Sequence, residues 1–497
     1  MATLKAYSAG TEPAFPASYD VTKRVTLNFT DIVSNNNKYY NAEVQVSKDG
    51  SARIYTQYGR LGGTAAKEYR VCTSQTHAEL EADKIIKSKI KKGYVEVKLV
   101  KADVGSEVGK SIVTSSILNE TAAIKLGYKI QEDIPSVLHP AIQSVVKTWF
   151  GSIDKFVIDT LDTSKCALGQ LSLDQINKGR DLLLEARKIV IAGAKDIKSL
   201  NDISSKYYSN IPMNFGYRKL DVDKLRFDTN DKLDLAFDIL DTLEGAKDAQ
   251  KVLSKKNAVD EQYKSLKTEM EVVDTSDPIW KWIDTMFHKT RASNHNFLGK
   301  MKIHNIFKLS RDEEQKIYMS MAETMASKSD KYDKDLPSLL KPIWSNKVKE
   351  DRYYQELIDR ANILPLFHGT RTPNFPKILS SRLMMRKPGF TVAGAMYDKN
   401  GGLYFGMSSK SINYSSAAGS YWSGGSDKTA YIFLSDVALG KQKIATGAYP
   451  YTLDGIKPCM SVWAKGGQSG VVNDEFIVYT EKQNWLRYVI EFETMLK

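Results

Sequence analysis

The sequence predicts a multidomain α+β protein, with a small α+β domain, an all-α helix bundle and a mixed, mainly antiparallel β domain in that order. A chain of 497 residues is too long for one hydrophobic core. Apolar residues alternate with polar ones near the N-terminus, recur at helical spacing in the middle, and fall in short runs between glycine-rich turns in the last half. We place a flexible tail at 1–24, the small domain at 25–104, a linker at 105–134, the bundle at 135–255 and the β domain at 256–497.

Composition narrows the class of protein. Apolar content of 42% with 26% charged residues is that of ordinary globular domains. The chain has no secretory signal and no apolar run long enough to span a bilayer, so we expect no membrane association. Cys72, Cys166 and Cys459 lie far apart, which favours a reducing compartment and gives neither a zinc module nor a disulfide framework. A net charge of +12 suits a polyanionic partner such as nucleic acid.

The first domain has strand and helix signals in a clear order. Residues 1–24 contain Gly and Pro without an apolar period, which is typical of a tail. From Val25 the alternation predicts a strand, and Asp49-Gly50 predicts a tight hairpin turn into a second strand over 52–58. A helix is expected over about 74–92. The lysines at its end are either a solvated helix terminus or a nucleic-acid contact.

The middle of the chain is helical. Ser172-Leu173-Asp174-Gln175 is a capping box, and apolar residues then fall on one face of the helix that it begins. The pattern breaks near Pro212 and returns over 231–253. No residue in this part of the sequence suggests a catalytic role, so we expect the helix bundle to serve packing or regulation.

The last half carries the candidate chemistry. Its short predicted strands are 364–367, 402–405, 429–437, 475–479 and 486–492. His368, Tyr404 and Glu475 each lie at the edge of one of them, where a strand delivers a side chain into a cleft. There is no Gly-x-Gly-x-x-Gly opening a helix and no Gly-Lys-Ser/Thr, which argues against a Rossmann or P-loop nucleotide site.

Three stretches of the first domain resemble a WGR domain, the DNA-break-sensing module of poly(ADP-ribose) polymerases. They are residues 35–40 (Asn-Asn-Asn-Lys-Tyr-Tyr), 57–60 (Gln-Tyr-Gly-Arg) and 91–94 (Lys-Lys-Gly-Tyr). Tyr58 stands where that family has Trp. The resemblance implies that Asn37, Lys38, Tyr58 and Arg60 bind nucleic acid, whereas the residues alone allow Tyr58 to be core and Arg60 to cap a turn. The order Leu171-Ser172, Ile211-Pro212, Phe215-Gly216, Leu240-Asp241 and Leu243 is similar to the helical regulatory domain of the same family.

From Tyr263 to the end the chain resembles the catalytic domain of these polymerases. The family's His-Tyr-Glu triad falls on His368 in His-Gly-Thr-Arg-Thr-x-Asn-Phe, Tyr404 in Leu-Tyr-Phe, and Glu475 in Glu-Phe-Ile-Val-Tyr. The resemblance implies that NAD is the substrate and that no metal takes part. The residues that it implies for NAD binding are His368, Gly369, Thr370, Arg371, Asn374, Tyr404, Phe405, Lys410, Ser411, Tyr414 and Glu475.

The chemistry fits these residue types. Cleavage of the nicotinamide–ribose bond passes through an oxocarbenium-like state, which a carboxylate such as Glu475 can stabilise while it polarises an acceptor hydroxyl. By resemblance, Tyr404 and Tyr414 sandwich the nicotinamide ring, and Ser411 donates its hydroxyl to the carboxamide. Lys410 either steers the acceptor or is simply solvated. Without the resemblance, composition favours a surface residue at a strand start as the interpretation of Glu475.

The sequence therefore predicts a DNA-break-activated poly(ADP-ribose) polymerase that modifies itself and chromatin-type proteins. The resemblance also implies a nuclear location, binding to DNA ends or nicks, and a monomer. Two departures put chain elongation in doubt: the segment 440–472 is short, and Asn473 and Asp474 replace an aromatic–Asn pair. Mono-ADP-ribosylation, activation by RNA, and a catalytically weak DNA-end scaffold remain the alternatives.

Overall fold

The computed structural model describes residues 4–60, 64–97, 136–160, 171–193, 196–213, 215, 219–250, 258–328, 336–344, 352–385, 396–399, 401–420 and 424–495. The chain forms two compact units, residues 1–122 with 154–247 and residues 123–153 with 248–497. The predicted linker 105–134 lies outside the described residues. The predicted bundle 135–255 is divided, because helix α4 (Pro140–Thr160) lies partly in each unit.

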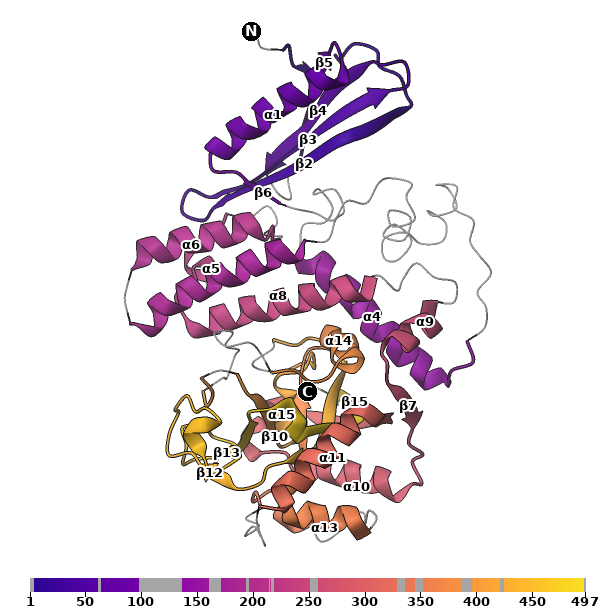
Figure 1. Cartoon of the computed structure of the whole chain (residues 1–497), viewed down its shortest axis with the longest axis vertical. Helices are drawn as coiled ribbons and strands as arrows, with labels where there is room; N and C mark the ends of the chain where they lie inside the picture. Colours follow the sequence, from indigo (N-terminus) through magenta and orange to yellow (C-terminus); the bar gives the residue numbers. More distant parts are fainter. Residues whose placement is uncertain are drawn as a thin grey trace. The chain divides into compact units, whose positions relative to one another are not determined.

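The first unit begins with a six-stranded antiparallel sheet in the order β1-β5-β4-β3-β2-β6. Helix α1 crosses one face of this sheet (Figure 1). Ala78 and Ala82 of α1 pack against Val44 and Ile54 of the sheet. The elements are β1 (Tyr7–Ser8), β2 (Tyr19–Asp31), β3 (Asn36–Ser47), β4 (Ala52–Arg60), β5 (Ala66–Cys72), α1 (Gln75–Lys91) and β6 (Val95–Glu96).

Residues 4–24, which belong to the segment 1–24 expected to be a flexible tail, instead contribute strands to this sheet. They contain β1, which pairs with β5, and the first residues of β2, where Tyr19 pairs with Ser47. The guanidinium of Arg53 lies 4.0 Å from the centre of the Phe15 ring, a cation–π contact that holds the segment against β4. The expectation was wrong because strand pairing and this contact outweigh the local Pro and Gly signals.

The local signals for the turn and the helices are confirmed. Gly50 takes a positive φ of 86° in the β3–β4 hairpin, and Ser74 caps α1 by accepting a hydrogen bond from the His77 N–H. Ser172 accepts from the Gln175 N–H at 3.2 Å at the start of α5, as the capping box predicts. The helices that follow in this unit are α5 (Leu173–Ile191), α6 (Ile197–Asn210), α7 (Val222–Leu225) and α8 (Asn230–Gln250).

Buried hydrogen bonds join β2 to the end of α6. The Asn28 side chain is fully buried and its Nδ2 donates to the carbonyls of Tyr208 (2.9 Å) and Ser209 (3.1 Å). The Ser209 hydroxyl accepts from the Thr30 N–H at 2.8 Å and donates to the Thr30 carbonyl at 3.1 Å. The last carbonyls of a helix have no partner within it, so Asn28 satisfies groups that α6 leaves open. The strand and the helix thus form one polar interface.

The second unit is built on a nine-stranded sheet in the order β12-β13-β14-β10-β9-β11-β15-β8-β7. Every pairing in it is antiparallel except that of β12 with β13, which agrees with the predicted mixed, mainly antiparallel domain. The strands are β7 (Glu269–Val272), β8 (Lys300–Ser310), β9 (Ile363–Gly369), β10 (Leu403–Gly406), β11 (Thr429–Ala438), β12 (Gln442–Ile444), β13 (Ser461–Ala464), β14 (Glu475–Val478) and β15 (Asn484–Met495).

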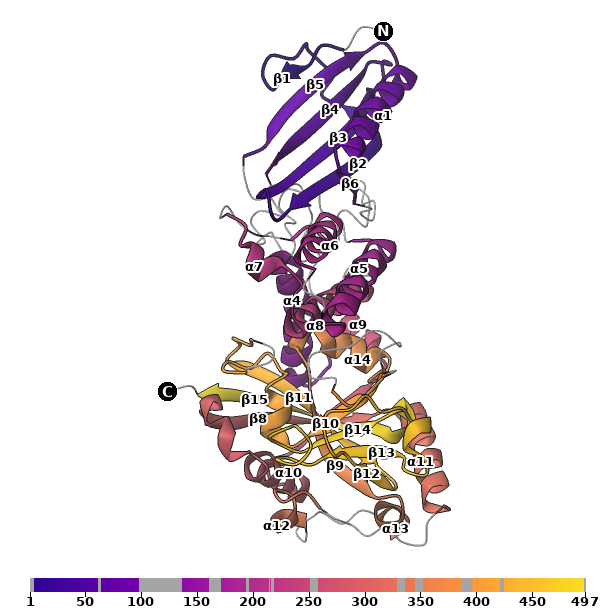
Figure 2. The same ribbon diagram turned by 90° about the vertical axis from the view of Figure 1, so that its left-hand side faces the viewer.

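Helices flank this sheet, as the two views in Figures 1 and 2 show. They are α9 (Ala258–Ser265), α10 (Pro278–Lys289), α11 (Asp312–Ala326), α12 (Lys341–Trp344), α13 (Arg352–Arg360), α14 (Phe375–Ser380) and α15 (Ser408–Ile412), with short 3₁₀ turns η1 (Ser293–Leu298), η2 (Thr372–Asn374), η3 (Asp454–Ile456) and η4 (Glu481–Gln483). Among the helices that the structure describes, none has the length and apolar character needed to cross a membrane.

Helix α4 reaches the sheet through one aromatic side chain. Trp149 is fully buried, stacks on Phe375 with ring centres 5.3 Å apart, and meets Tyr431 edge-on at 5.7 Å. Phe375 in turn stacks on Phe433 at 4.5 Å. Aromatic contacts of this kind stabilise beyond their buried area. They explain why the first part of α4 belongs with the β domain.

Candidate active site

The three catalytic candidates come from three neighbouring strands. His368 is on β9, Tyr404 on β10 and Glu475 on β14, and these strands are adjacent in the order β14-β10-β9. Glu475 pairs with Gly406, two residues from Tyr404, so the side chains of Tyr404 and Glu475 leave the sheet on the same face. The sheet therefore brings together residues that are more than a hundred positions apart in sequence.

Glu475 is buried and only half satisfied. Its side chain has one oxygen, Oε1, 2.5 Å from Lys410 Nζ. The other oxygen, Oε2, is buried without a hydrogen-bond partner among the described residues. Burial raises the pKa of the Glu475 carboxyl above its ordinary value, and the Lys410 ammonium opposes that rise. A buried carboxylate oxygen with nothing to accept from is poised to take a hydroxyl of a ligand.

His368 and Gly369 are the last two residues of β9, and Gly369 lies against Ser411 of α15. The imidazole Nδ1 of His368 lies 2.9 Å from the Tyr404 carbonyl, to which it donates. A Cβ on Gly369 would lie 1.7 Å from the Ser411 carbonyl oxygen, so only glycine allows this close backbone approach. The Ser411 hydroxyl donates to the Phe367 carbonyl at 2.9 Å. Together these contacts fix a narrow backbone cradle between β9 and α15.

Thr370, Arg371 and Asn374, which are also predicted to bind NAD, lie in the segment that follows β9. Asn374 Nδ2 donates to the Thr370 hydroxyl at 2.9 Å, which ties the segment to itself. Arg371 has a buried Nε with no hydrogen-bond partner in the described part of the chain. Lys410 Nζ lies 5.8 Å from the centre of the Tyr414 ring. The structure thus gathers Lys410, Tyr414 and Glu475 in one place.

Phe405 lies beside His368, with the two ring centres 5.7 Å apart. Its side chain is 3% exposed and packs in the hydrophobic core on the other face of β10 from Tyr404. Successive side chains of a strand point to opposite faces, so the rings of Tyr404 and Phe405 leave β10 on opposite faces. Contact between Phe405 and NAD stays a prediction.

His295, to which the sequence assigned no role, reaches the same centre. It is 5% exposed, its Nδ1 lies 2.8 Å from the Ser409 hydroxyl and its Nε2 lies 3.1 Å from Asn473 Nδ2. The amide nitrogen of Asn473 donates to Nε2, so Nδ1 carries the ring proton and donates to the Ser409 hydroxyl. Burial lowers the pKa of His295 to about 4, and the nearby charge of Lys410 adds to this. His295 is thus a neutral group that ties the residues before Glu475 to those beside Lys410.

The nucleic-acid candidates lie at one end of the first sheet. Lys38 is exposed, whereas Asn37 is 1% exposed and accepts from the Thr30 hydroxyl at 3.0 Å. Lys38 and Asn37 face opposite ways because they are neighbours on a strand, and contact between Asn37 and nucleic acid stays a prediction. Arg60 donates to the Asn35 carbonyl at 2.7 Å and to its side-chain oxygen at 3.0 Å.

Tyr58 is half-buried at the same end. It stacks on Tyr40 with ring centres 5.3 Å apart, and its hydroxyl donates to Glu68 at 2.7 Å. Lys89 of α1 lies 4.1 Å from the centre of the Tyr40 ring and 5.5 Å from that of Tyr58. A tyrosine stack with a cation over it forms where the family has a tryptophan, so this position keeps an aromatic packing role.

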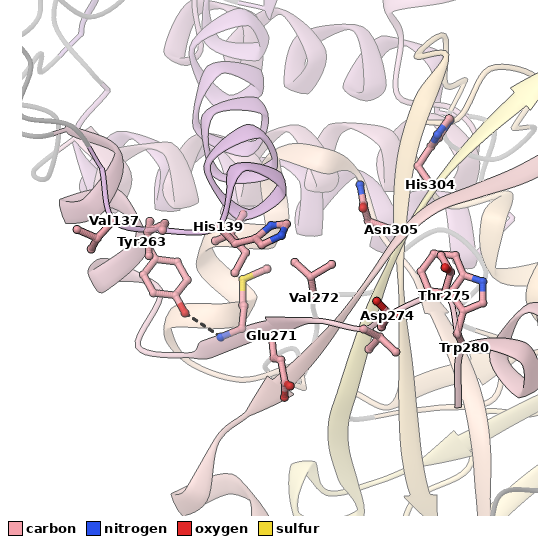
Figure 3. Close-up of a pocket in the computed structure, with 14 residues that line it drawn as sticks. Val137, His139, Tyr263, Glu271, Val272, Asp274, Thr275, Trp280, His304 and Asn305 are labelled. Carbon is pink, nitrogen blue, oxygen red and sulfur yellow. Dashed lines mark hydrogen bonds between the residues drawn. The ribbon is translucent and has the colours of Figure 1, made fainter. Parts of the chain in front are cut away.

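A cavity of about 600 Å³ opens elsewhere in the second unit. Figure 3 shows Tyr263, Trp280 and His304 among its lining, with the dashed hydrogen bond from the Met270 N–H to the Tyr263 hydroxyl. None of the catalytic candidates lines it. The described residues hold no group of three His, Cys, Asp or Glu side chains that could bind a metal ion.

Comparison with known families covers most of the chain. Residues 23–101 match the model of the WGR domain, residues 136–270 that of the poly(ADP-ribose) polymerase regulatory domain, and residues 280–494 that of the poly(ADP-ribose) polymerase catalytic domain. The three matches follow one another in the order that the sequence predicts.

Curated relatives agree with this. The chain is 26% identical to the poly [ADP-ribose] polymerase of Sarcophaga peregrina over 85% of its length and 38% of that protein. It is 25% identical to poly [ADP-ribose] polymerase 1 of Gallus gallus over 94% of its length and 45% of that protein. It is 24% identical to the human protein mono-ADP-ribosyltransferase PARP3 over 94% of its length and 87% of that protein. The chain spans less than half the length of the first two relatives.

The part of the chain that carries His368, Tyr404 and Glu475 thus matches the poly(ADP-ribose) polymerase catalytic domain, and with the WGR and regulatory domains before it the chain belongs to the poly(ADP-ribose) polymerase family.

Proposed function

We propose that the protein is a DNA-break-activated poly(ADP-ribose) polymerase, which cleaves NAD, releases nicotinamide and transfers ADP-ribose to protein side chains. The observation that carries this proposal is the buried, unpartnered Oε2 of Glu475 beside the Lys410–Glu475 ion pair. A carboxylate held in this way can accept a hydrogen bond from a ribose hydroxyl and stabilise positive charge on the ribose ring. We further propose that the protein acts in the nucleus as a monomer, on itself and on chromatin-type proteins.

The reaction balances with the groups present. The bond between the nicotinamide nitrogen and ribose C1′ breaks, and its electron pair leaves with neutral nicotinamide. An oxygen of the acceptor side chain forms the new bond to C1′ of the oxocarbenium-like centre. When the acceptor is a hydroxyl, Glu475 takes its proton; when it is a carboxylate, no proton moves. The Lys410 ammonium favours the ionised form of Glu475, because it opposes the rise in pKa that burial causes.

The cradle beside the triad supports binding of the nicotinamide end. The backbone at Gly369, which approaches Ser411 closely, offers hydrogen-bonding groups of the kind that a carboxamide needs. Tyr404 and Tyr414 supply aromatic faces for the ring, and His368 is proposed to contact the adenosine ribose. Thr370, Arg371 and Asn374 are proposed to position the rest of NAD.

DNA ends or nicks are proposed to activate the enzyme by binding the WGR domain. A WGR domain, exposed Lys38 and the lysines of α1 support contact with phosphates, and Arg60 would act through the Asn35 segment. The Asn28 and Thr30 bonds to the end of α6 give a physical route from this domain to the regulatory helices. In this proposal the regulatory helices block the NAD site in a closed state and leave it accessible in an open state. DNA would activate the enzyme only if it binds the open state better than the closed state.

A mono-ADP-ribosyltransferase is the second candidate. It is favoured by the match to a human mono-ADP-ribosyltransferase, of which the chain covers 87%. The residues before the catalytic Glu are also bound within the protein, Asn473 to His295 and Asp474 to the Gly466 N–H at 2.8 Å. Such anchoring leaves little freedom for a loop that would accept a growing polymer.

One experiment separates these outcomes. Purified protein is incubated with radiolabelled NAD, with and without a nicked DNA hairpin or single-stranded RNA, and resolved on a denaturing gel. A DNA-dependent ladder supports the polymerase, and a single sharp band supports the mono-transferase. Labelling that does not depend on DNA contradicts the activation step. Labelling that RNA alone stimulates contradicts DNA as the activating partner. DNA binding without any labelling contradicts the transferase activity. The Glu475→Gln variant serves as the inactive control.

A further inference from the structure

The hydroxyl of Tyr404 has two partners, one of them charged. It donates to Asp398 Oδ2 at 2.8 Å and accepts from the Tyr397 N–H at 3.0 Å. Asp398 is 7% exposed, so this carboxylate is buried beside the ring rather than lying on the surface by chance. The comparisons and the triad give Asp398 no role. It precedes β10 in the Asp-Lys-Asn-Gly-Gly stretch at 398–402.

The backbone around Asp398 is shaped to place its carboxylate. The other carboxylate oxygen, Oδ1, accepts from the Gly401 N–H at 2.9 Å, and Gly401 has a φ of +100° that side-chain-bearing residues rarely adopt. A Cβ on Gly402 would lie 2.9 Å from Ile477 Cγ2 and 3.3 Å from Asp398 Cβ. Two glycines thus allow the turn to close tightly enough for Asp398 to reach the Tyr404 hydroxyl.

The hydrogen bond from Tyr404 to Asp398 is of the strong, charge-assisted kind. Burial and the Asp398 charge both raise the pKa of Tyr404 well above its ordinary value, so the phenol keeps its proton and remains the donor. If the carboxylate were absent, the Tyr397 N–H would still donate to the Tyr404 hydroxyl, but the hydroxyl would lose the acceptor for its own proton. A backbone donor to a hydroxyl fixes the ring less firmly than a pair of bonds on opposite sides of the oxygen.

We propose that Asp398 is the positioning residue of the nicotinamide subsite, which holds the Tyr404 ring in the orientation that stacks on the nicotinamide of NAD. This inference rests on the proposed function. It assigns to Asp398 no contact with the reacting atoms. Its effect reaches the substrate through Tyr404, so losing it should weaken binding of the nicotinamide ring more than it slows bond cleavage.

The test compares Asp398→Ala, Asp398→Asn, Tyr404→Phe and the double variant Asp398→Ala/Tyr404→Phe with the wild-type full chain. Lys399→Ala is the matched control, because Lys399 lies in the same turn with an exposed side chain. Nicotinamide affinity is measured by titration calorimetry, which needs no turnover. The kcat and KM for NAD are measured in parallel, and circular dichroism reports folding.

Asp398→Ala should weaken nicotinamide binding about tenfold, the size expected for a hydrogen bond to a charged group, and raise KM for NAD more than it lowers kcat. Asp398→Asn keeps one acceptor oxygen for the Tyr404 hydroxyl but loses the charge and the second acceptor for the Gly401 N–H, so it should weaken binding less than Asp398→Ala does. Tyr404→Phe should match Asp398→Ala, and the double variant should be no worse than either single one, because both remove the same bond.

The inference is overturned if Asp398→Ala binds nicotinamide as wild type does, if Lys399→Ala weakens binding equally, or if the two single effects multiply in the double variant. It is also overturned if the wild-type protein binds no nicotinamide. A wild type that binds nicotinamide but transfers no ADP-ribose refutes the proposed function separately, and the nicotinamide affinities then decide the role of Asp398.

Discussion

Replacing Lys410 by Met should destabilise the catalytic unit in a pH-dependent way. The side chains of Lys410 and Glu475 are 15% and 6% exposed, and their charged atoms lie 2.5 Å apart. Removing one partner of a buried ion pair leaves the other uncompensated, which costs about 3–5 kcal/mol. For a unit of this size that loss should lower the thermal midpoint by about 6–15 °C near neutral pH.

The sign of the pH effect follows from the pKa of Glu475. Burial raises this pKa and Lys410 opposes the rise, so Lys410→Met raises it further. In this variant, ionised Glu475 destabilises the fold at pH values above that pKa. The loss of unfolding free energy relative to wild type becomes smaller as the pH falls and the carboxyl is protonated. The acid limb of the pH–rate profile should move to higher pH, because the reaction uses the carboxylate.

Calorimetric unfolding and NAD turnover across pH 5 to 9 provide the assay. Lys428→Met is the matched control, because Lys428 is 78% exposed and 3.5 Å from Glu493, so its loss should change stability by less than about 1 kcal/mol. The double variant Lys410→Met/Glu475→Gln should recover most of the lost stability, since no buried charge remains. A pH-independent deficit, or a double variant as unstable as Lys410→Met, would refute the reasoning.

Three further predictions concern other contacts. Glu475→Gln should slow nicotinamide release from NAD by about 10²–10³-fold in a chromatographic assay, and an unchanged rate would remove the residue from the mechanism. Trp149→Ala should cost about 3–5 kcal/mol in urea unfolding because it empties the stack on Phe375, whereas a loss below about 1 kcal/mol would show that the contact is dispensable. Asn28→Ala should leave DNA affinity intact in an anisotropy titration while reducing DNA-stimulated activity several-fold. Ser209→Ala should act in the same direction. If DNA stimulated both variants as much as wild type, the proposed route would be wrong.

Local chemistry made much of the fold predictable. Helix α10 begins at Pro278 and ends at Lys289, as proline at a first helical turn and basic residues in the last turn indicate. The capping box at Ser172 begins α5, and β14 begins at Glu475, where the sequence places the catalytic carboxylate at a strand edge. These signals depend on neighbours within a few residues, so one sequence is enough to recognise them.

The missed residues depend on contacts between distant segments. His295 acquires its setting from Ser409 and Asn473, which are more than a hundred positions away and which only the closed sheet brings near. Asp398 gives the ordinary signal of a turn, and nothing local connects its carboxylate with Tyr404. The burial of Phe405 had a signal available, since the two-residue period of a strand already places it on the other face of β10 from Tyr404.

The origin of the triad in the interior of one sheet bears on how such enzymes can diverge. His368, Tyr404 and Glu475 are held by backbone pairing between β9, β10 and β14, whereas the segment from Gly440 to Val472 contributes mostly short strands and turns at the β12–β13 edge. Insertions and deletions in that segment can alter the surroundings of these three residues without moving the strands that hold them. Acceptor choice and product length can therefore evolve by loop exchange, while selection on bond cleavage acts on a separate and more rigid part of the molecule.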